Sequence, residues 1–173
     1  QLSLLKIMIF ETYMNKAYLL TGGNLGNREE NLLAAIGHIN QHCGLITNSS
    51  SLYETAAWGN TDQPAFLNQA LEIETELIAK QLMRRILKVE KLMGRIRKEK
   101  NGPRLIDIDI LLYADEIHNY KLLNLPHPEM QNRRFALLPQ AEIAPNIIHP
   151  VKQKTITELL KVCKDELEVK KYS

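Results

Sequence analysis

Two aspartates, Asp107 and Asp109, stand one residue apart in the most strand-like run of the chain, residues 105–113. Side chains at i and i+2 of a strand point to the same side, so we expect both carboxylates to project together. Two adjacent carboxylates repel each other unless a cation lies between them, and Mg²⁺ prefers such ligands together with phosphate oxygens and water. The alternative is an exposed face solubilised by two aspartates. Because Asp is a poor strand former, the pattern favours a magnesium site.

Three arginines lie on or beside the loop that leads into this run: Arg95, Arg97 and Arg104. The same loop contains the turn pair Gly102-Pro103. The planar guanidinium matches the oxygens of a phosphate, which makes Arg a preferred side chain for phosphate recognition. Such arginines beside a metal-binding carboxylate pair are typical of phosphoryl-type transfer, where catalysis is mostly positioning and neutralisation of charge. This window therefore indicates an enzyme of that kind.

The net charge conceals an asymmetry in the same region. Lys and Arg total 22 against 20 Asp and Glu, a balance of +2. Residues 84–104 contain nine basic and two acidic residues, which gives +7 for that segment and −5 for the remainder. Such a concentration of charge favours a polyanionic ligand. Three cations that share a helix face with Arg95 are instead expected to be solvated: Arg84, Lys88 and Lys91.

Composition and length set the remaining bounds. With 173 residues, 45% of them hydrophobic and 24% charged, the chain is unlike collagen-like, disordered or coiled-coil proteins. Cys43 and Cys163 form no metal-binding or disulfide pattern, which favours a reducing, cytoplasmic location. No stretch approaches the roughly 18 apolar residues that span a bilayer. We expect residues 1–13 to be a flexible extension and residues 14–173 to form a single domain.

The carboxylates and arginines need elements that position them, and hydrophobic periodicity predicts these elements. A helix is predicted over residues 78–93, with an apolar face of Leu82, Ile86, Val89 and Met93. Helices are also predicted over 27–43, 133–144 and 155–164, and strands over 17–21, 45–55, 66–77 and 105–113. The order strand, helix, strand, strand, helix, strand matches an α+β ferredoxin-like sandwich, in which one antiparallel sheet has two helices packed on one face.

Several nucleotide-binding signatures are missing from the sequence. The chain has neither a P-loop nor the protein-kinase signature set. Its Gly-rich turn at residues 22–26, GGNLG, lacks the spacing of the dinucleotide fingerprint. We expect the backbone of this turn to approach a ligand closely.

The run KNGPRLIDIDIL at residues 100–111 resembles the signature of the 6-hydroxymethyl-7,8-dihydropterin pyrophosphokinase family. Members of that family transfer pyrophosphate from ATP to a pterin alcohol in folate biosynthesis and release AMP. Further segments that resemble the family lie at residues 22–26, 53–55, 62–68, 90–97 and 126–135. The resemblance covers residues 17–150. It implies the ferredoxin-like fold, ATP as co-substrate and two Mg²⁺.

The resemblance also implies roles for individual residues. In the catalytic set, Asp107 and Asp109 would hold the Mg²⁺ ions, while Arg95 and Arg104 would close over the phosphates from a mobile loop. The residues implied in ATP binding are Glu90, Arg97, Ile110, His127 and Arg133. Those implied in pterin binding are Phe66 and Phe135 on the two ring faces, Asn68 at the amide edge, and the backbone of Thr55 and Ala57.

Each implied role has a simpler alternative. Without the resemblance, the two phenylalanines would be interpreted as core aromatics, Asn68 as an exposed side chain and His127 as a loop residue. The chain also departs from the family pattern: Gly23 stands where Ser is usual, Phe66 where Tyr is frequent, Pro128 in place of Tyr, Asn101 where some members carry Trp, and Ala56-Ala57 in place of Pro-Pro. The last three of these changes, at Pro128, Asn101 and Ala56-Ala57, concern loop closure and peripheral contacts. Trp58 could act as a lid or pack on its own loop.

Two other functions are alternatives. Ferredoxin-like folds with basic surfaces also bind RNA, but the aromatic-rich motif of that class is missing and aromatic residues make up only 6% of the chain. A nucleotidyl transferase could use the same carboxylate pair and would release pyrophosphate. We expect a cytoplasmic monomer whose partners are ATP and the hydroxymethyl-dihydropterin, and which binds neither nucleic acid nor a membrane.

Overall fold

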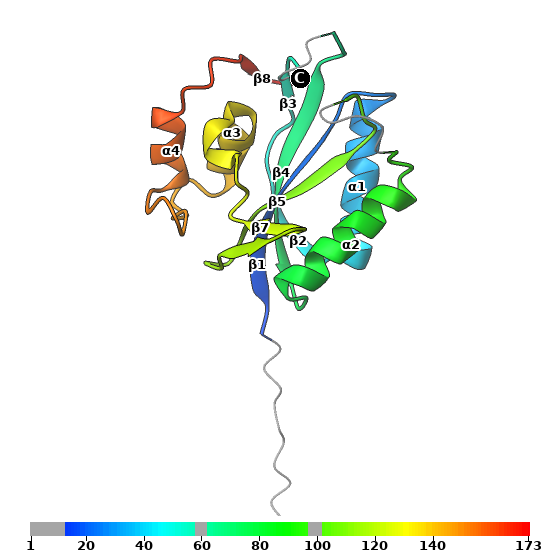
Figure 1. The fold of residues 1–173 in the computed structure, drawn as a ribbon. Helices are drawn as coiled ribbons and strands as arrows, with labels where there is room; N and C mark the ends of the chain where they lie inside the picture. Colours follow the sequence, from blue (N-terminus) through cyan, green and yellow to red (C-terminus); the bar gives the residue numbers. More distant parts are fainter. Residues whose placement is uncertain (1–12, 58–61, 97–101) are drawn as a thin grey trace, which may run out of the picture.

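An antiparallel sheet forms the centre of the molecule in a computed structural model that describes residues 13–57, 62–96 and 102–173 (Figure 1). Its strands follow the order β5-β1-β4-β3-β8, and β2 pairs with β4 beyond this path. The strands are β1 (Asn15–Gly23), β2 (Leu45–Ser49), β3 (Tyr53–Thr55), β4 (Phe66–Thr75), β5 (Asp107–Tyr113) and β8 (Val169–Lys171), with a separate hairpin of β6 (His118–Tyr120) and β7 (Leu123–Leu125). The helices are α1 (Arg28–His42), α2 (Ala79–Leu92), α3 (Arg134–Ile143) and α4 (Ile156–Val162), and a 3-10 turn spans Met130–Asn132. None of these described helices is long and apolar enough to cross a membrane.

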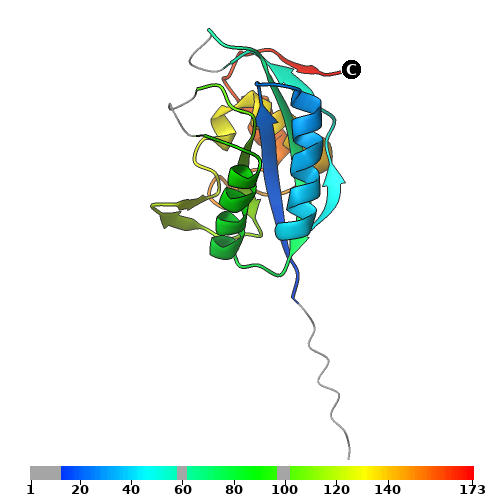
Figure 2. The ribbon, with the colours of Figure 1, turned by 90° about the vertical axis from the view of Figure 1, so that its right-hand side faces the viewer.

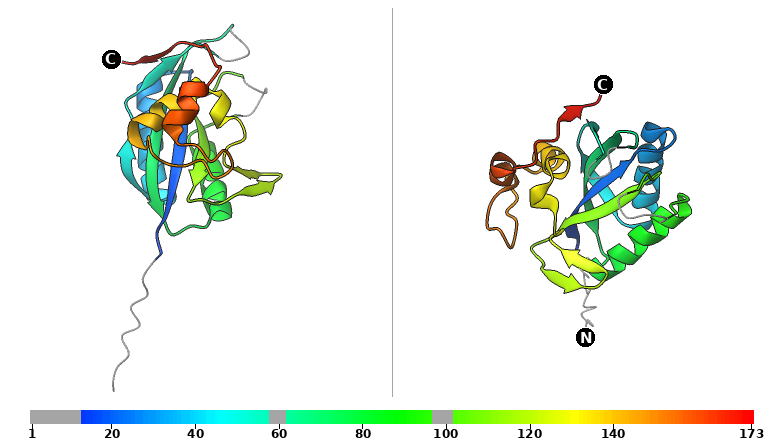
Figure 3. Two further views of the ribbon diagram at one scale, coloured as in Figure 1. Left: turned by 90° about the vertical axis from the view of Figure 1, so that its left-hand side faces the viewer. Right: turned by 45° about the horizontal axis from the view of Figure 1, so that its top comes forward.

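Helices cover both faces of the sheet, and β1 shows the reason. Ala17 and Leu19 belong to the core under α1 and α2, whereas Tyr18 and Leu20 belong to the core under α3 and α4. Because successive side chains of a strand alternate between faces, a strand buried on both sides is apolar at every position. Figure 2 shows α1 and α2 in front of the sheet, and the left view of Figure 3 shows α3 and α4 on the opposite face. The predicted α+β ferredoxin-like sandwich is confirmed. The helices predicted over 133–144 and 155–164 are α3 and α4, and they form a further layer on the other face of the sheet, a placement that the sequence did not indicate.

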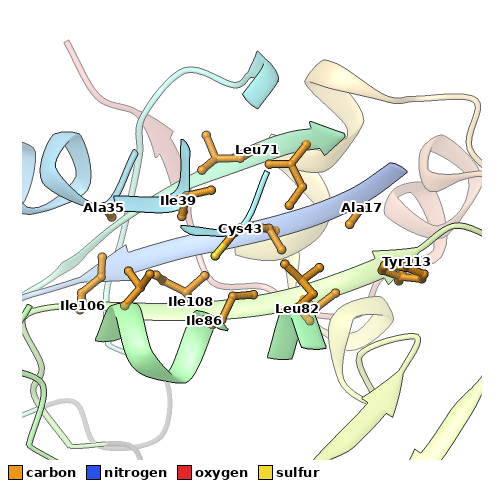
Figure 4. Close-up of a cluster of buried hydrophobic side chains, with 14 of the residues drawn as sticks. Ala17, Ala35, Ile39, Cys43, Leu71, Leu82, Ile86, Ile106, Ile108 and Tyr113 are labelled. Atoms are coloured by element: carbon orange, nitrogen blue, oxygen red, sulfur yellow. The ribbon is translucent and has the colours of Figure 1, made fainter. Parts of the chain in front are cut away.

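The apolar stripe predicted for α2 is the part of that helix that faces the sheet. Leu82, Ile86 and Val89 are 0% exposed, and Figure 4 shows Ile86 beside Ile108 of β5. Gly94 follows the helix with a φ of +83°, a conformation that favours glycine. The cations predicted to form a solvated face are exposed: Arg84, Lys88 and Lys91.

The predicted strand over residues 45–55 is two strands in the structure. Residues 50–52 separate them, yet the amide of Ser50 donates to the carbonyl of Ala70 and its hydroxyl accepts from the amide of Ala70, both at 2.9 Å. Strand β4 therefore keeps its backbone hydrogen bonds where its neighbour bends. Strand β8 was not predicted, because three residues are too few to show periodicity. Helix α4 ends at Val162, two residues before the predicted end.

Candidate active site

Strand β5 carries both predicted metal ligands on one side. Ile106, Ile108 and Ile110 belong to the core under α1 and α2 and are at most 3% exposed. Asp107 and Asp109 alternate with them and therefore lie on the opposite side, as their spacing predicted.

Two arginines hold Asp107. Nη1 of Arg95 lies 2.5 Å from its Oδ1 and also bonds Glu90. Nε of Arg104 lies 3.0 Å from its Oδ2. Glu90 is 3% exposed and accepts a hydrogen bond of 2.9 Å from the amide of Ile108, so it anchors Arg95 to β5. Two of the predicted phosphate-binding arginines thus meet one of the predicted metal ligands.

The negative charge of Asp109 is less well neutralised than that of Asp107, which contacts two arginines. Burial, followed by the negative charge of Asp107, raises the pKa of Asp109, while Arg133 and Arg104 act against this rise. The Asp109 side chain is still 36% exposed, so water screens part of the effect. Burial alone would lower the pKa of the Arg95 guanidinium, but the carboxylates around it raise that pKa. A carboxylate pair with this residual repulsion is one that a cation would stabilise.

The donor set of this pair fits a hard cation. Two carboxylates supply oxygen ligands of the type that Mg²⁺ prefers, and the remaining positions would fall to phosphate oxygens and water. No group of three or more His, Cys, Asp or Glu side chains that could hold a metal occurs in the part of the chain that the structure describes. Asp107 and Asp109 therefore suit an ion that arrives with a phosphate ligand better than one held entirely by protein side chains.

His127 faces Asp109 as a neutral ring. Its Nδ1 accepts a hydrogen bond of 3.1 Å from the amide of Glu129, which assigns the ring hydrogen to Nε2, 3.9 Å from Oδ2 of Asp109. Burial, followed by the positive charge of Arg133, lowers the pKa of His127 to about 4. At neutral pH the ring therefore offers an N–H donor without a charge.

The second half of the site is built on β3 and β4. Thr55 pairs with Phe66 across the two strands, and its buried hydroxyl has no hydrogen-bond partner among the described residues. Asn68 is 5% exposed and lies opposite Gly22 of β1, where a Cβ would come within 2.3 Å of its Oδ1. Ala57, just after β3, is 3% exposed. The strand pair thus brings together four of the five residues implied in pterin binding.

Arg104 connects the two halves. Its guanidinium carbon lies 4.7 Å from the centre of the Phe66 ring, while its Nε contacts Asp107. Arg133 lies in a similar way 5.8 Å from the ring centre of Phe135, at the start of α3. A flat ligand on the same ring face would have to displace the guanidinium, since both occupy the electron-rich side of the ring.

Asn24 belongs to this site, and sequence reasoning missed its role. Its Nδ2 donates to the carbonyl of Pro64 at 2.9 Å and to Oε1 of Gln63 at 3.0 Å. Its Oδ1 accepts from the amide of Arg104 at 2.9 Å. A buried amide thereby ties the arginine loop to the segment before Phe66. Its position in the Gly-rich turn was the one available signal.

Comparisons with known proteins identify the family of this site. The sequence profile of 7,8-dihydro-6-hydroxymethylpterin-pyrophosphokinase (HPPK) matches residues 18–145. This chain belongs to the HPPK family. The 2-amino-4-hydroxy-6-hydroxymethyldihydropteridine pyrophosphokinase of Aquifex aeolicus is 44% identical over 145 residues, which are 84% of this chain and 90% of that protein. The Haemophilus influenzae protein of the same name is 39% identical over 159 residues, 91% and 98% of the two chains.

HPPK units also occur within longer proteins. A crystal structure of wild-type Plasmodium falciparum HPPK-DHPS matches the fold with a TM-score of 0.71 and 18% identity, over 86% of this chain and 44% of that one. The folic acid synthesis protein fol1 of Schizosaccharomyces pombe is 37% identical over 153 residues, only 21% of its length. The structural likeness concerns the fold alone, and the sequence likeness carries the family assignment.

The HPPK departure at Gly23 has a structural reason in this chain. A Cβ at Gly23 would lie 2.3 Å from the carbonyl oxygen of Leu105. The amides of Asn24 and Leu25 donate to the carbonyl of Arg104 at 3.0 and 3.3 Å, which draws the arginine loop against the turn. In the structure the turn approaches this loop, and its close approach to a ligand stays a prediction.

Some residues implied by the HPPK resemblance are placed differently or lie elsewhere. The Ile110 side chain is 2% exposed in the core under α1 and α2, so only its backbone could contact a nucleotide on the Asp109 side. Two other departures from the family, Ala56 and Pro128, are exposed. Some parts of the sequence interpretation lie outside the described residues: Trp58, Arg97, Asn101 and residues 1–12 of the predicted extension.

Proposed function

We propose that this chain transfers pyrophosphate from ATP to the hydroxymethyl group of 6-hydroxymethyl-7,8-dihydropterin, in a Mg²⁺-dependent step of folate biosynthesis that releases AMP. The pterin hydroxyl oxygen attacks the β-phosphorus, the bond from that phosphorus to the α-phosphate oxygen breaks, AMP leaves with that oxygen and its electron pair, and the hydroxyl proton passes to water. The observation that carries the proposal is the meeting of Arg95 and Arg104 at Asp107, beside Asp109, in a chain of the HPPK family.

Asp107 and Asp109 would hold the magnesium ions, two according to the family resemblance. Bound Mg²⁺ would neutralise phosphate charge and align the reacting groups. Arg95 keeps a second carboxylate partner in the buried Glu90, so we assign it a fixed position beside the phosphates. Arg104 contacts Asp107, the Phe66 ring and the carbonyl of Gly102 in its own loop, at 2.8 Å. None of these three partners is a buried carboxylate such as Glu90, so we assign the movement onto the transferred group to Arg104.

The nucleotide would lie along the Asp109 side of β5. The neutral Nε2–H of His127 and the charge of Arg133 face this side and suit phosphate or ribose oxygens. The backbone of Ile110 and the side chain of Arg97 complete the proposed nucleotide contacts, and Glu90 acts through Arg95.

The pterin would lie between Phe66 and Phe135, with Asn68 at its amide edge. The hydroxyl of Thr55, buried beside Phe66, and the backbone at Ala57 offer further polar contacts. Arg104 must leave the face of Phe66 when the pterin stacks there, and the same movement would bring its charge towards the phosphates. Pterin binding and placement of the catalytic arginine would therefore be one event.

The test is identification of the nucleotide product. Purified protein with Mg²⁺, ATP and the hydroxymethyl-dihydropterin should release AMP in amounts equal to the pterin consumed, as measured by ion-exchange chromatography. ADP as product would overturn the proposal, and released pyrophosphate would point to the nucleotidyl transferase. RNA binding that falls steeply with salt, without ATP binding, would point to the RNA-binding alternative.

We further propose that residues 14–173 act as one domain, as a monomer, in the cytoplasm. The two free cysteines support the location, and the interlocked contacts of β3, β4 and β8 support one folding unit. Light scattering after size exclusion should give the mass of one chain.

A further inference from the structure

Arg28 is a cation at the N-terminal end of a helix, where acidic residues are preferred. It is the first residue of α1, directly after the N-cap Asn27, whose side chain accepts from the amide of Glu30. The N-terminal end of a helix carries partial positive charge, so acidic residues are favoured there and cations are not. Glu29 and Glu30 follow this rule and Arg28 does not. A residue that breaks a local rule usually has partners elsewhere.

The partners of Arg28 lie on the strand pair of the proposed pterin site. Its Nη1 donates to the carbonyl oxygen of Ala65 at 2.9 Å and lies 2.6 Å from Oε2 of Glu54. Ala65 directly precedes Phe66, and Glu54 directly precedes Thr55. Because Thr55 pairs with Phe66, one guanidinium holds both strands beside the two residues that would contact the pterin.

Tyr172, which follows strand β8, contacts the guanidinium of Arg28. The guanidinium carbon lies 5.6 Å from the ring centre of Tyr172, whose hydroxyl donates to Oε1 of Glu29 at 2.9 Å. The amide of Tyr172 donates to the carbonyl of Leu52 at 2.8 Å. Strand β8, just before it, pairs with β3 so that Val169 lies opposite Thr55. The terminal segment therefore closes a ring of contacts around Arg28, beyond the residues that match the family profile.

We propose that Arg28 is a positioning residue for pterin binding, and that Tyr172 holds its guanidinium in place for this role. The inference rests on the proposed pyrophosphokinase function. The bond to Ala65 fixes the peptide plane that leads into Phe66, and the direction of that plane sets the tilt of the ring. Stacking depends on ring orientation, so a loose Ala65 carbonyl weakens pterin binding. Among the residues that the structure describes, the contacts of Arg28 lie on β3, β4 and the segment after β8 and not on the Asp107 side of the site, so we expect ATP binding not to depend on it.

The experiment compares four variants with the intact chain. Arg28→Ala removes the bonds, and Arg28→Lys keeps the charge but loses the planar guanidinium. Tyr172→Ala removes the stacking partner, whereas Tyr172→Phe keeps the ring. Lys16→Ala is the matched control, because Lys16 forms an ion pair of 3.2 Å with Glu72 near the other end of β1. Hydroxymethyl-dihydropterin binding is titrated by its fluorescence with a non-reacting ATP analogue present, binding of that analogue is titrated by calorimetry, and kcat and both KM values are measured.

We expect Arg28→Ala to weaken pterin binding about 10-fold, the equivalent of one hydrogen bond to a charged group, with the KM for ATP within about 2-fold of the intact chain. Arg28→Lys and Tyr172→Ala should each give a smaller loss, and Tyr172→Phe and Lys16→Ala none. If Arg28→Ala does not fold, Tyr172→Ala tests the positioning role instead, by whether pterin binding weakens while the KM for ATP stays within about 2-fold.

Two results would overturn the positioning role. One is unchanged pterin affinity in Arg28→Ala, or in Tyr172→Ala if that variant decides. The other is an equal loss for pterin and ATP, because that would show general destabilisation. Both are read from binding, whereas failure of the proposed function would appear as an intact chain that forms no AMP.

Discussion

Asp107 is the residue on which the charges of the site converge. Arg95 and Arg104 approach its two oxygens, while Asp109 repels it from the next position on the same face of β5. Without a ligand, the arginines neutralise the first carboxylate. With phosphates and a cation present, the same guanidiniums have stronger partners in the phosphate oxygens. The resting ion pairs therefore keep the charged groups of the proposed reaction assembled before substrate arrives.

Asp107→Ala should lower kcat by at least about 1000-fold, because loss of a metal ligand removes on the order of 4 kcal/mol of charge stabilisation. AMP release measures the loss, and circular dichroism with a thermal melt checks that the fold is retained. Asp115→Ala is the matched control, since Asp115 is exposed in the turn after β5. Undiminished turnover in Asp107→Ala would refute the metal assignment.

Arg104→Ala should separate catalysis from binding. We expect kcat to fall about 100-fold, as for loss of one charge-stabilising donor, while the affinity for ATP changes little. Pterin binding without nucleotide should become about 2- to 5-fold tighter, because the guanidinium no longer covers the Phe66 ring. Fluorescence titration measures this, with the exposed Arg84→Ala as control. Weaker pterin binding would contradict the covering role.

At the scale of elements, the register between β1 and β4 determines where the pterin-binding side chains lie. Gly22 stands opposite Asn68, and its missing Cβ leaves the space that the Asn68 amide occupies. The neighbouring Gly23 leaves space for the backbone of Leu105 instead. Two consecutive glycines at the end of β1 thus allow close approach of the pterin-binding strand β4 at Gly22 and of the arginine loop at Gly23.

Gly22→Ala should therefore weaken pterin binding about 10-fold by displacing the Asn68 amide, while the free energy of unfolding changes by less than about 1 kcal/mol, since the clash is with the end of a side chain. Gly37→Ala is the control, because beyond the backbone of α1 itself the space at its Cβ position is open. It should stabilise the protein by about 0.5 to 1 kcal/mol without changing binding. Equal pterin affinity in both variants would contradict the role of Gly22.

At the scale of the whole molecule, each of the two cores contains one cysteine, and the two cysteines differ in burial. Cys43 lies in the core under α1 and α2 and is 2% exposed, whereas Cys163 is half-buried at the edge of the core under α3 and α4. Burial raises the pKa of the Cys43 thiol to about 11, although Arg85 acts in the opposite direction. The thiolate is the reactive form, so a raised pKa lowers the reactivity of Cys43 at pH 8.

Iodoacetamide at pH 8 should accordingly modify Cys163 in the folded protein and Cys43 only on unfolding. Peptide mass spectrometry over a denaturant series measures both, and modification of Cys43 should follow the unfolding curve. ATP and the pterin should shift that curve to higher denaturant, since ligands stabilise the folded state by mass action. Equal rates for both cysteines in the folded protein would show that the first core opens locally.

The sequence by itself determined what depends on near neighbours in the chain. The i, i+2 spacing of a strand placed Asp107 and Asp109 on one side, and the helical period placed Leu82, Ile86 and Val89 against the sheet. Those patterns hold in any fold that contains the strand and the helix. The sequence also indicated the family, because the family signature is a continuous run of residues, 100–111 in this chain.

Tertiary structure alone decided which distant residues meet. The contact of Arg104 with Phe66, and of Arg28 with Ala65, Glu54 and Tyr172, follows from sheet register and from the strand β8 that closes the edge. Local periodicity carries no information about such pairings, because a register shift of one residue would turn every side chain to the other face without changing the pattern.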